Sequence, residues 1–298
     1  MNKDEAAKEI ENQIIASFNC NVNEIVCHPI RLIQASKSLI GLNLDNPNQR
    51  LIDFSELYLN EKLSKKLLKS KVINNQVNEV INIHDLENAI LSKDRAKISD
   101  SINQLSKVSS SLHILEYLIE ISLKENGSSF LVLWSIYRSI FFIGERNLDD
   151  FRELIIEVVL CDRISEYPQS NINIDDIVLI DNLSLEDIDL YSHLIELKHS
   201  NLVRSEKLVP LADKMINRFS IRKDLKNQPK NVNQIKSKFN KKGRVWILDY
   251  INEIDPKKIT FEFILFLDSI RCLLKYLNID KHKYVFKHFE RLVKNFNV

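Results

Sequence analysis

A short polar stripe with acid–base character runs through an otherwise apolar stretch near the middle of the chain. His113, Glu116, Tyr117 and Glu120 are spaced three or four residues apart, which puts them on one face of a helix. An imidazole beside carboxylates is a usual combination for proton transfer or ligand binding. If the helix is central, the stripe faces an interior cleft, and His113, Glu116 and Glu120 are candidate catalytic residues.

The next apolar stretch carries a single charge, Arg138, between Trp134 one turn earlier and Phe142 one turn later. A buried guanidinium needs a carboxylate partner, because an unpaired buried charge is costly. The short connection makes the two helices antiparallel neighbours, so we expect Arg138 to pair with Glu116 or Glu120 and to join the candidate site. A purely structural ion pair, or an arginine that reaches solvent along its apolar stem, is the simpler alternative.

Three histidines suggest a metal site. His28 and His84 each lie at or near the start of a predicted helix, and with His113 they would supply three imidazole ligands from three helices. No spacing in the sequence brings them together, so capping or partly exposed imidazoles are the alternative.

A second polar group follows later in the chain and contains Asp189, His193, Glu196 and His199. It holds one Glu-x-x-His motif, whereas a ferritin-like di-iron site needs two, together with two further glutamates. Asp189, His193 and Glu196 share one helix face, and leucine, isoleucine and tyrosine cover the other. This pattern predicts a solvated face.

The segment 222–244 is the clearest anomaly in composition. It carries a net charge of +8, whereas the whole chain carries only +1. A mobile basic loop could bind phosphate backbones or an acidic partner, but its single aromatic, Phe239, offers little base stacking. A plain linker is the alternative. The candidate nucleic-acid contacts are Lys230, Lys236, Lys238, Lys241, Lys242 and Arg244.

The composition excludes several classes of fold and site. The chain has 298 residues with only 4 glycines and 6 prolines, where average usage would give roughly twenty glycines. Few positive-φ turns are therefore possible, which argues against β-sandwiches and β-barrels. No G-x-G-x-x-G, G-x-x-x-x-G-K-[ST] or G-x-S-x-G motif occurs, which argues against a Rossmann domain, a P-loop and a nucleophile elbow.

Apolar residues recur at helical spacing in nearly every segment. The sequence therefore predicts an all-α fold, either an irregular multi-helix bundle or an α-solenoid-like stack, with roughly a dozen helices. Asp94 and Ser184 read as N-caps, Ser110 or Ser111 as the start of another helix, and Pro29 as the first residue of a helix. The expected domains are an N-terminal helical body over 1–165, a helical continuation over 166–221, the basic loop or linker over 222–244, and C-terminal helices over 245–298.

The compartment is predicted from the cysteines and the hydropathy. Cys20, Cys27, Cys161 and Cys272 form no C-x-x-C pair, which fits a reducing compartment. The first residues contain no apolar signal segment, and no uncharged run exceeds twelve residues, which is too short to span a membrane. We therefore expect a soluble cytoplasmic protein without a membrane partner.

The sequence contains no nucleotide-binding loop, no paired metal motif and no nucleophile motif. We therefore favour a binding or scaffold protein that acts through a protein partner. One alternative is a metal- or cofactor-dependent helical enzyme whose site combines histidines and carboxylates of the N-terminal body. Another is nucleic-acid association through 222–244. The sequence leaves open whether the protein is an enzyme and which cofactor it would use.

Overall fold

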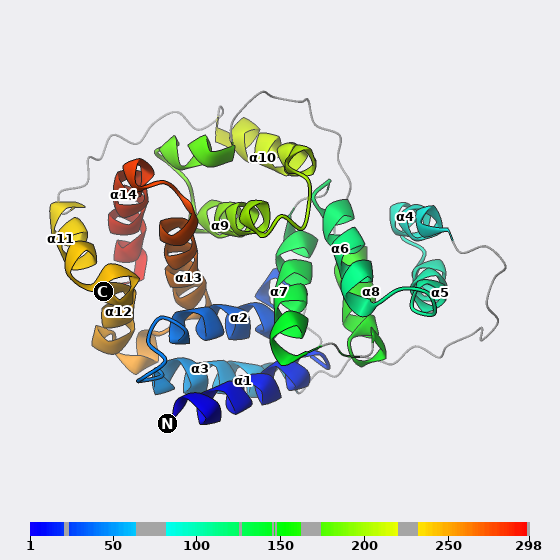
Figure 1. Ribbon diagram of the computed structural model, residues 1–298, viewed down its shortest axis with the longest axis horizontal. Helices are drawn as coiled ribbons and strands as arrows, with labels where there is room; N and C mark the ends of the chain where they lie inside the picture. The colour runs from blue at the N-terminus through cyan, green and yellow to red at the C-terminus, as the bar shows by residue number, and fades with distance from the viewer. Residues whose placement is uncertain are drawn as a thin grey trace. The chain divides into compact units, whose positions relative to one another are not determined.

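The computed structural model describes residues 1–20, 24–63, 82–124, 127–144, 146, 148–161, 174–219 and 232–296. This part of the chain forms fourteen α-helices, joined by short 3₁₀-helices and turns, and contains no β-strand (Figure 1). The prediction of an all-α, multi-helix fold is confirmed. Within the same ranges, no helix is both long and apolar enough to cross a membrane.

The α-helices are α1 (Lys3–Ser17), α2 (Pro29–Ile40), α3 (Gln49–Leu63), α4 (Ile83–Leu91), α5 (Arg95–Leu105), α6 (Ser111–Ser122), α7 (Ser128–Ile143), α8 (Arg152–Cys161), α9 (Leu185–Ser200), α10 (Ser205–Phe219), α11 (Val232–Lys242), α12 (Ile247–Glu253), α13 (Phe261–Tyr276) and α14 (His282–Val293).

Several of these helices begin where local sequence signals predict. The side chain of Asp94 accepts hydrogen bonds from the amides of Ala96 and Lys97 at the start of α5. Ser110 accepts from the amide of His113 at the start of α6. Each of these side chains satisfies backbone donors that the first turn of a helix leaves without an intrahelical partner.

The start of α2 uses a histidine as its cap. His28 precedes Pro29, and its Nδ1 accepts a hydrogen bond from the amide of Ile30 at 3.2 Å. The ring is fully buried. Because Nδ1 accepts a hydrogen bond here, the neutral ring carries its own proton on Nε2. His28 is therefore a buried structural cap in the neutral form.

The chain divides into two compact units, which are described separately. Unit 1 comprises 1–10, 35–55 and 167–298, and unit 2 comprises 11–34 and 56–166. Helices α1, α2 and α3 each contribute residues to both units. The domain boundaries expected from the sequence stay predictions, and the expected boundary at 165/166 lies outside the described residues.

Unit 2 is built around α6, α7 and α8. Every side chain of α7 from Ser129 to Ile136 is buried, so α7 lies at the centre of the unit. Helices α4 and α5 form a hairpin whose α5 packs on α8. Arg95 of α5 bonds Glu157 at 2.6 Å and Glu153 at 3.2 Å, so charged pairs contribute to this contact.

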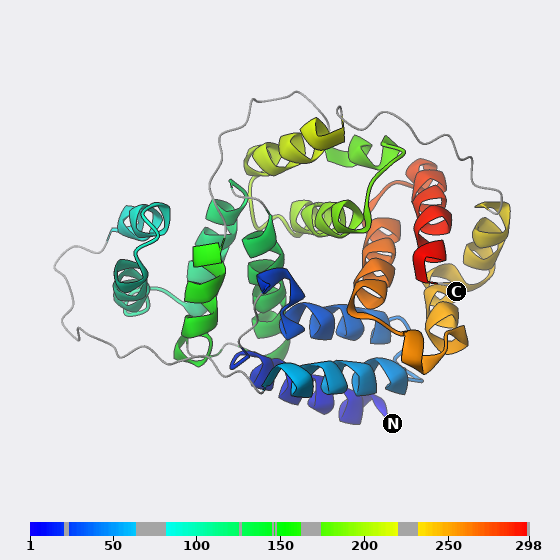
Figure 2. The ribbon, with the colours of Figure 1, turned by 180° about the vertical axis from the view of Figure 1, so that it is seen from behind.

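Unit 1 is built around α9 and α13, which pack closely against each other. Figure 2 shows α10 and the 3₁₀-helix η3 (Ile174–Leu179) on one side of α9 and α13 on another. Helix α14 packs on α13 through a cluster of aromatic rings that includes Phe266 and Phe289. Val285, Phe289, Leu292 and Val293 form one apolar face of α14, and all four are buried.

Half of the expected basic loop is helical instead. Residues 232–242 form α11, because Ile235 and Phe239, four residues apart, are an apolar pair that packs against the body of unit 1. Gly243 follows at a φ of 57°, a left-handed conformation that ends the helix without side-chain strain. Residues 222–231, which include Lys230, lie outside the described residues.

The start of α9 provides a test of local capping. Ser184 accepts a hydrogen bond from the amide of Asp187 at 3.1 Å, and the Asp187 carboxylate accepts one from the amide of Ser184 at 2.8 Å, which is a capping box. We expect Ser184→Ala to lower the free energy of unfolding by about 1 kcal/mol in urea denaturation. Ser184→Thr, which keeps the acceptor oxygen, should lose clearly less, and an equal loss would contradict the capping role.

Candidate functional site

The polar stripe on α6 lies at the surface of unit 2. His113 is exposed, and Glu116, Tyr117 and Glu120 are half-buried. The stripe therefore does not line an interior cleft, which was the condition for an acid–base role of His113. Helix α6 is amphipathic enough to place this stripe outward while its leucines and isoleucines fill the core.

Two tyrosine hydroxyls bond carboxylates on this surface. Tyr137 of α7 donates to Glu116 at 3.4 Å, and burial together with the Glu116 charge raises the pKa of Tyr137. Tyr117 donates to Glu87 of α4 at 3.3 Å, and burial, followed by the Glu87 charge, raises its pKa to about 12. Both phenols therefore stay protonated near neutral pH and act as hydrogen-bond donors that tie neighbouring helices together.

Glu87 is the point where α4 meets α6. It accepts a bond of 2.7 Å from Lys124, and this bond is the main cause of its lowered pKa. The carboxylate is thus ionised at neutral pH and holds both Lys124 and Tyr117. The contact with Glu87 therefore gives Tyr117, one residue of the polar stripe, a structural role in joining α6 to α4.

Arg138 lies half-buried on α7, next to Tyr137. Its pairing with Glu116 or Glu120 stays a prediction. Because all three side chains are partly exposed, a guanidinium–carboxylate pair here would lie at the surface, where such pairs stabilise by at most about 1 kcal/mol.

The last turn of α7 exposes large apolar side chains. Phe141 is 75% exposed and Phe142 41% exposed. The Ser111 hydroxyl donates to the carbonyl of Arg146, so the start of α6 and the end of α7 meet at one end of the helix pair. Val108, 65% exposed just before α6, lies at this same end.

The alignment of α6 with α7 places the polar stripe of α6 beside the exposed aromatic end of α7. Glu116 lies opposite Tyr137, so His113, one turn earlier on α6, is at the level of Phe141, one turn later on α7. We call the outer face formed by His113, Glu116, Tyr137, Arg138 and Phe141 the α6–α7 surface.

The three candidate metal ligands have separate surroundings. His28 is buried as the cap of α2, and burial lowers its pKa to about 4. His84 is exposed and its Nδ1 lies 3.7 Å from Glu87. Across the described ranges, no group of three His, Cys, Asp or Glu residues is placed to hold a metal ion, and these three histidines form none.

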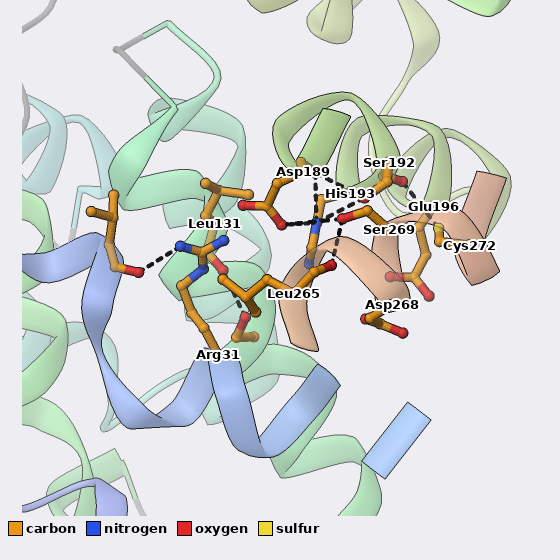
Figure 3. A network of polar contacts seen from close by, with 12 residues as sticks. Arg31, Leu131, Asp189, Ser192, His193, Glu196, Leu265, Asp268, Ser269 and Cys272 are labelled. Carbon is orange, nitrogen blue, oxygen red and sulfur yellow. Dashed lines mark hydrogen bonds and ion pairs between the residues drawn. The ribbon is translucent and has the colours of Figure 1, made fainter. Parts of the chain in front are cut away.

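The polar group on α9 is buried, so the prediction of a solvated face is wrong. Asp189, His193 and Glu196 are each less than a tenth exposed. The physical reason is that α9 is covered all round, with α13 packed along this polar side (Figure 3). His199 lies near the end of the helix and stacks on Tyr276.

Helix α13 supplies polar partners for α9. Arg271 bonds Asp268 on its own helix at 2.5 Å, and its guanidinium lies 4.0 Å from Glu196. Burial disfavours the charge on Arg271, but the carboxylates of Asp268 and Glu196 outweigh that cost and raise its pKa. Asp189, His193, Glu196, Asp268 and Arg271 form what we call the α9–α13 network.

Hydroxyl and thiol groups complete the α9–α13 interface. The Ser269 hydroxyl lies 3.4 Å from the Asp189 carboxylate, and the Cys272 thiol donates to the carbonyl of Ser192 (Figure 3). The Nδ1 of His193 lies 2.8 Å from the carbonyl of Asp189. A carbonyl can only accept, so this nitrogen carries the proton. These buried polar contacts orient α9 against α13.

Comparison of this chain with protein-family models, with curated proteins and with solved structures finds no match.

Proposed function

We propose that the protein is a binding or scaffold protein and that the α6–α7 surface is the site at which it contacts a protein partner. The observation that carries the proposal is Phe141, a large aromatic side chain held three-quarters in solvent at the end of a helix that is buried from Ser129 to Ile136. Exposing such a side chain costs hydrophobic free energy that a partner would recover.

The composition of the surface supports this role. Tyr137, Arg138 and Phe141 follow one another on one side of α7, and Tyr, Arg and aromatic residues are enriched in the cores of protein interfaces. Tyr137 is fixed in place by its bond to Glu116 and by stacking on the buried ring of Trp134. A pre-oriented aromatic side chain loses little conformational entropy on binding.

The partner we propose is a protein with an apolar pocket for Phe141 and a carboxylate near that pocket for Arg138. Because Arg138 is positively charged and lies beside Phe141, acidic residues around the partner's pocket would complement it. The expected location is the cytoplasm, which the four free cysteines support.

Site-specific photo-crosslinking tests the proposal. A benzophenone analogue of phenylalanine at position 141 should give a discrete adduct with one protein in the native cell. Phe141→Ser and Arg138→Met should each weaken that association in pull-down by at least about tenfold, the scale of a hot-spot residue. Thermal unfolding should change little, because both side chains are at the surface.

The matched control is Ile279, which is 85% exposed in unit 1. The same crosslinker at position 279 should not capture the protein captured from position 141, and Ile279→Ser should leave the association intact. Equal capture from both positions, or no discrete adduct from position 141, would refute the proposed site.

The enzyme alternative, with its site among His113, Glu116, Glu120 and Arg138, stays a prediction. The nucleic-acid alternative gains a specific observation, the helical form of α11, and is developed next.

A further inference from the structure

Helix α11 is a compact basic element on unit 1. Its eleven residues, Val232–Lys242, contain four lysines and no acidic residue. Lys236, Lys238 and Lys241 are exposed. Figure 1 shows α11 beside α14 and α12, at the edge of unit 1. Its outer side is therefore open to a ligand.

The inner side of α11 is firmly anchored. Ile235 is buried, and the ring of Phe239 lies 5.6 Å from that of His282 and 5.4 Å from that of Phe286. Because Ile235 and Phe239 are already packed, the described side chains of α11 leave no apolar face to insert into a lipid surface, which membrane-bound amphipathic helices require.

The outer side of α11 is polar but uncharged along its centre. Asn233, Ser237 and Asn240 are exposed and spaced by about one turn, opposite Ile235 and Phe239. Lysines lie beside this stripe: at 100° per residue, Lys236 is on one flank and Lys241 on the other, and Lys238 lies further round the helix, toward Ile235. The helix thus offers hydrogen-bonding groups in the middle and positive charge on both sides.

The flanking charges are available to a ligand. Among the described residues, Lys236 and Lys241 have no carboxylate partner, and Lys238 lies over the ring of Tyr250 at 5.2 Å. Lys242 pairs with Asp249 at 2.8 Å and is therefore left out of the site.

We propose that α11 binds double-stranded DNA, with its polar stripe in the major groove and Lys236, Lys238 and Lys241 on the phosphates at the groove edges. The major groove of B-DNA is wide enough for an α-helix. Lysines supply phosphate contacts, and short polar side chains such as Asn and Ser can reach base edges.

Other nucleic acids fit this helix less well. Single strands are bound mainly by stacking on exposed aromatic rings, and Phe239, the one aromatic residue of α11, faces inward. Duplex RNA has a deep and narrow major groove that side chains cannot enter.

The test is fluorescence anisotropy of the full chain with a labelled DNA duplex of about 20 base pairs, at several salt concentrations between about 50 and 200 mM. Wild-type affinity should fall steeply with salt. In the triple variant Lys236→Gln, Lys238→Gln and Lys241→Gln, affinity should drop at least about tenfold, and the slope of log K against log salt should shrink by about 2.7, or about 0.9 for each lost phosphate contact.

The matched control removes three exposed lysines elsewhere in unit 1: Lys8, Lys257 and Lys258. It has the same net charge as the first variant and should keep the wild-type affinity and slope. An equal loss in the control, absence of wild-type binding, or equal affinity for duplex RNA would overturn the proposal. Binding to acidic phosphatidylserine vesicles in place of DNA would overturn it as well.

Discussion

Replacing Arg271 with methionine is expected to lower the free energy of unfolding by about 3–5 kcal/mol, the cost of breaking a buried ion pair by removing one partner. Arg271 is 6% exposed and Asp268 2% exposed. Their bond of 2.5 Å is the one cationic contact of Asp268 among the described residues. Methionine keeps most of the stem but leaves the carboxylate buried without a counter-charge.

Urea denaturation followed by circular dichroism measures this loss. The double variant Arg271→Met with Asp268→Asn should recover part of it, because the buried carboxylate charge is gone. The matched control is Arg95→Met in unit 2. Arg95 is 39% exposed beside Glu153 and Glu157, so its loss should be at most about 1 kcal/mol. Equal losses at Arg271 and Arg95 would show that burial of the first pair has no energetic consequence.

The sequence predicted best what depends on neighbouring residues. The caps Asp94, Ser110 and Ser184 bond amides two or three positions away, so their signals lie within one turn of chain. The same holds for His28-Pro29 at the start of α2. Helix positions and the all-α class follow from such local patterns.

The α9–α13 network was missed because burial depends on distant residues. Asp189 and Ser269 are in contact although they lie 80 positions apart in the sequence. No pattern near Asp189 indicates that contact. A usable signal did exist in α13, where Asp268 and Arg271 interrupt an apolar run. The reasoning applied to Arg138 fits Arg271 better, because Arg271 is the one that is buried.

For the basic segment 222–244 the error was the opposite one, because a stretch predicted as a loop or linker contains a packed helix. Its lysines and asparagines suggested a linker, but Ile235 and Phe239 lie four residues apart and are enough to hold a helix when α14 provides Phe286. The partner surface is almost 50 positions away, so the two apolar residues could not be read as an anchor from the segment alone.

The other large expected effect is a loss of stability in mild acid, caused by two buried histidines. His288 of α14 lies between the carbonyl of Val178, 2.9 Å from its Nε2, and the guanidinium of Arg291, 3.3 Å from its Nδ1. Burial is the main cause that lowers its pKa to about 4. Arg291 and Lys287 lower it further, whereas the Val178 hydrogen bond and Asp181 oppose the shift. His28 has its pKa lowered to about 4 by burial as well.

The direction of the effect follows from proton binding. The unfolded chain binds a proton to each histidine near pH 6.5, whereas the folded chain does so only near pH 4. Between these values the unfolded state holds more protons, so stability is complete above about pH 6.5 and falls as the pH decreases toward 4. By pH 4.5 each histidine should have removed about 2–3 kcal/mol.

Two neutral substitutions test this loss. His28→Asn keeps an acceptor for the amide of Ile30, and His288→Gln keeps a donor for the carbonyl of Val178. At pH 7 each variant should be somewhat less stable than the wild type, because the imidazole packing is lost. At pH 4.5 the difference should shrink or reverse by about 2–3 kcal/mol for each histidine, since the variants take up no proton there. His113→Asn, at an exposed side chain outside both histidine sites, should change the free energy of unfolding little. If urea denaturation gives the same wild-type-to-variant difference at pH 7 and pH 4.5, the buried histidines do not set the acid sensitivity of the fold.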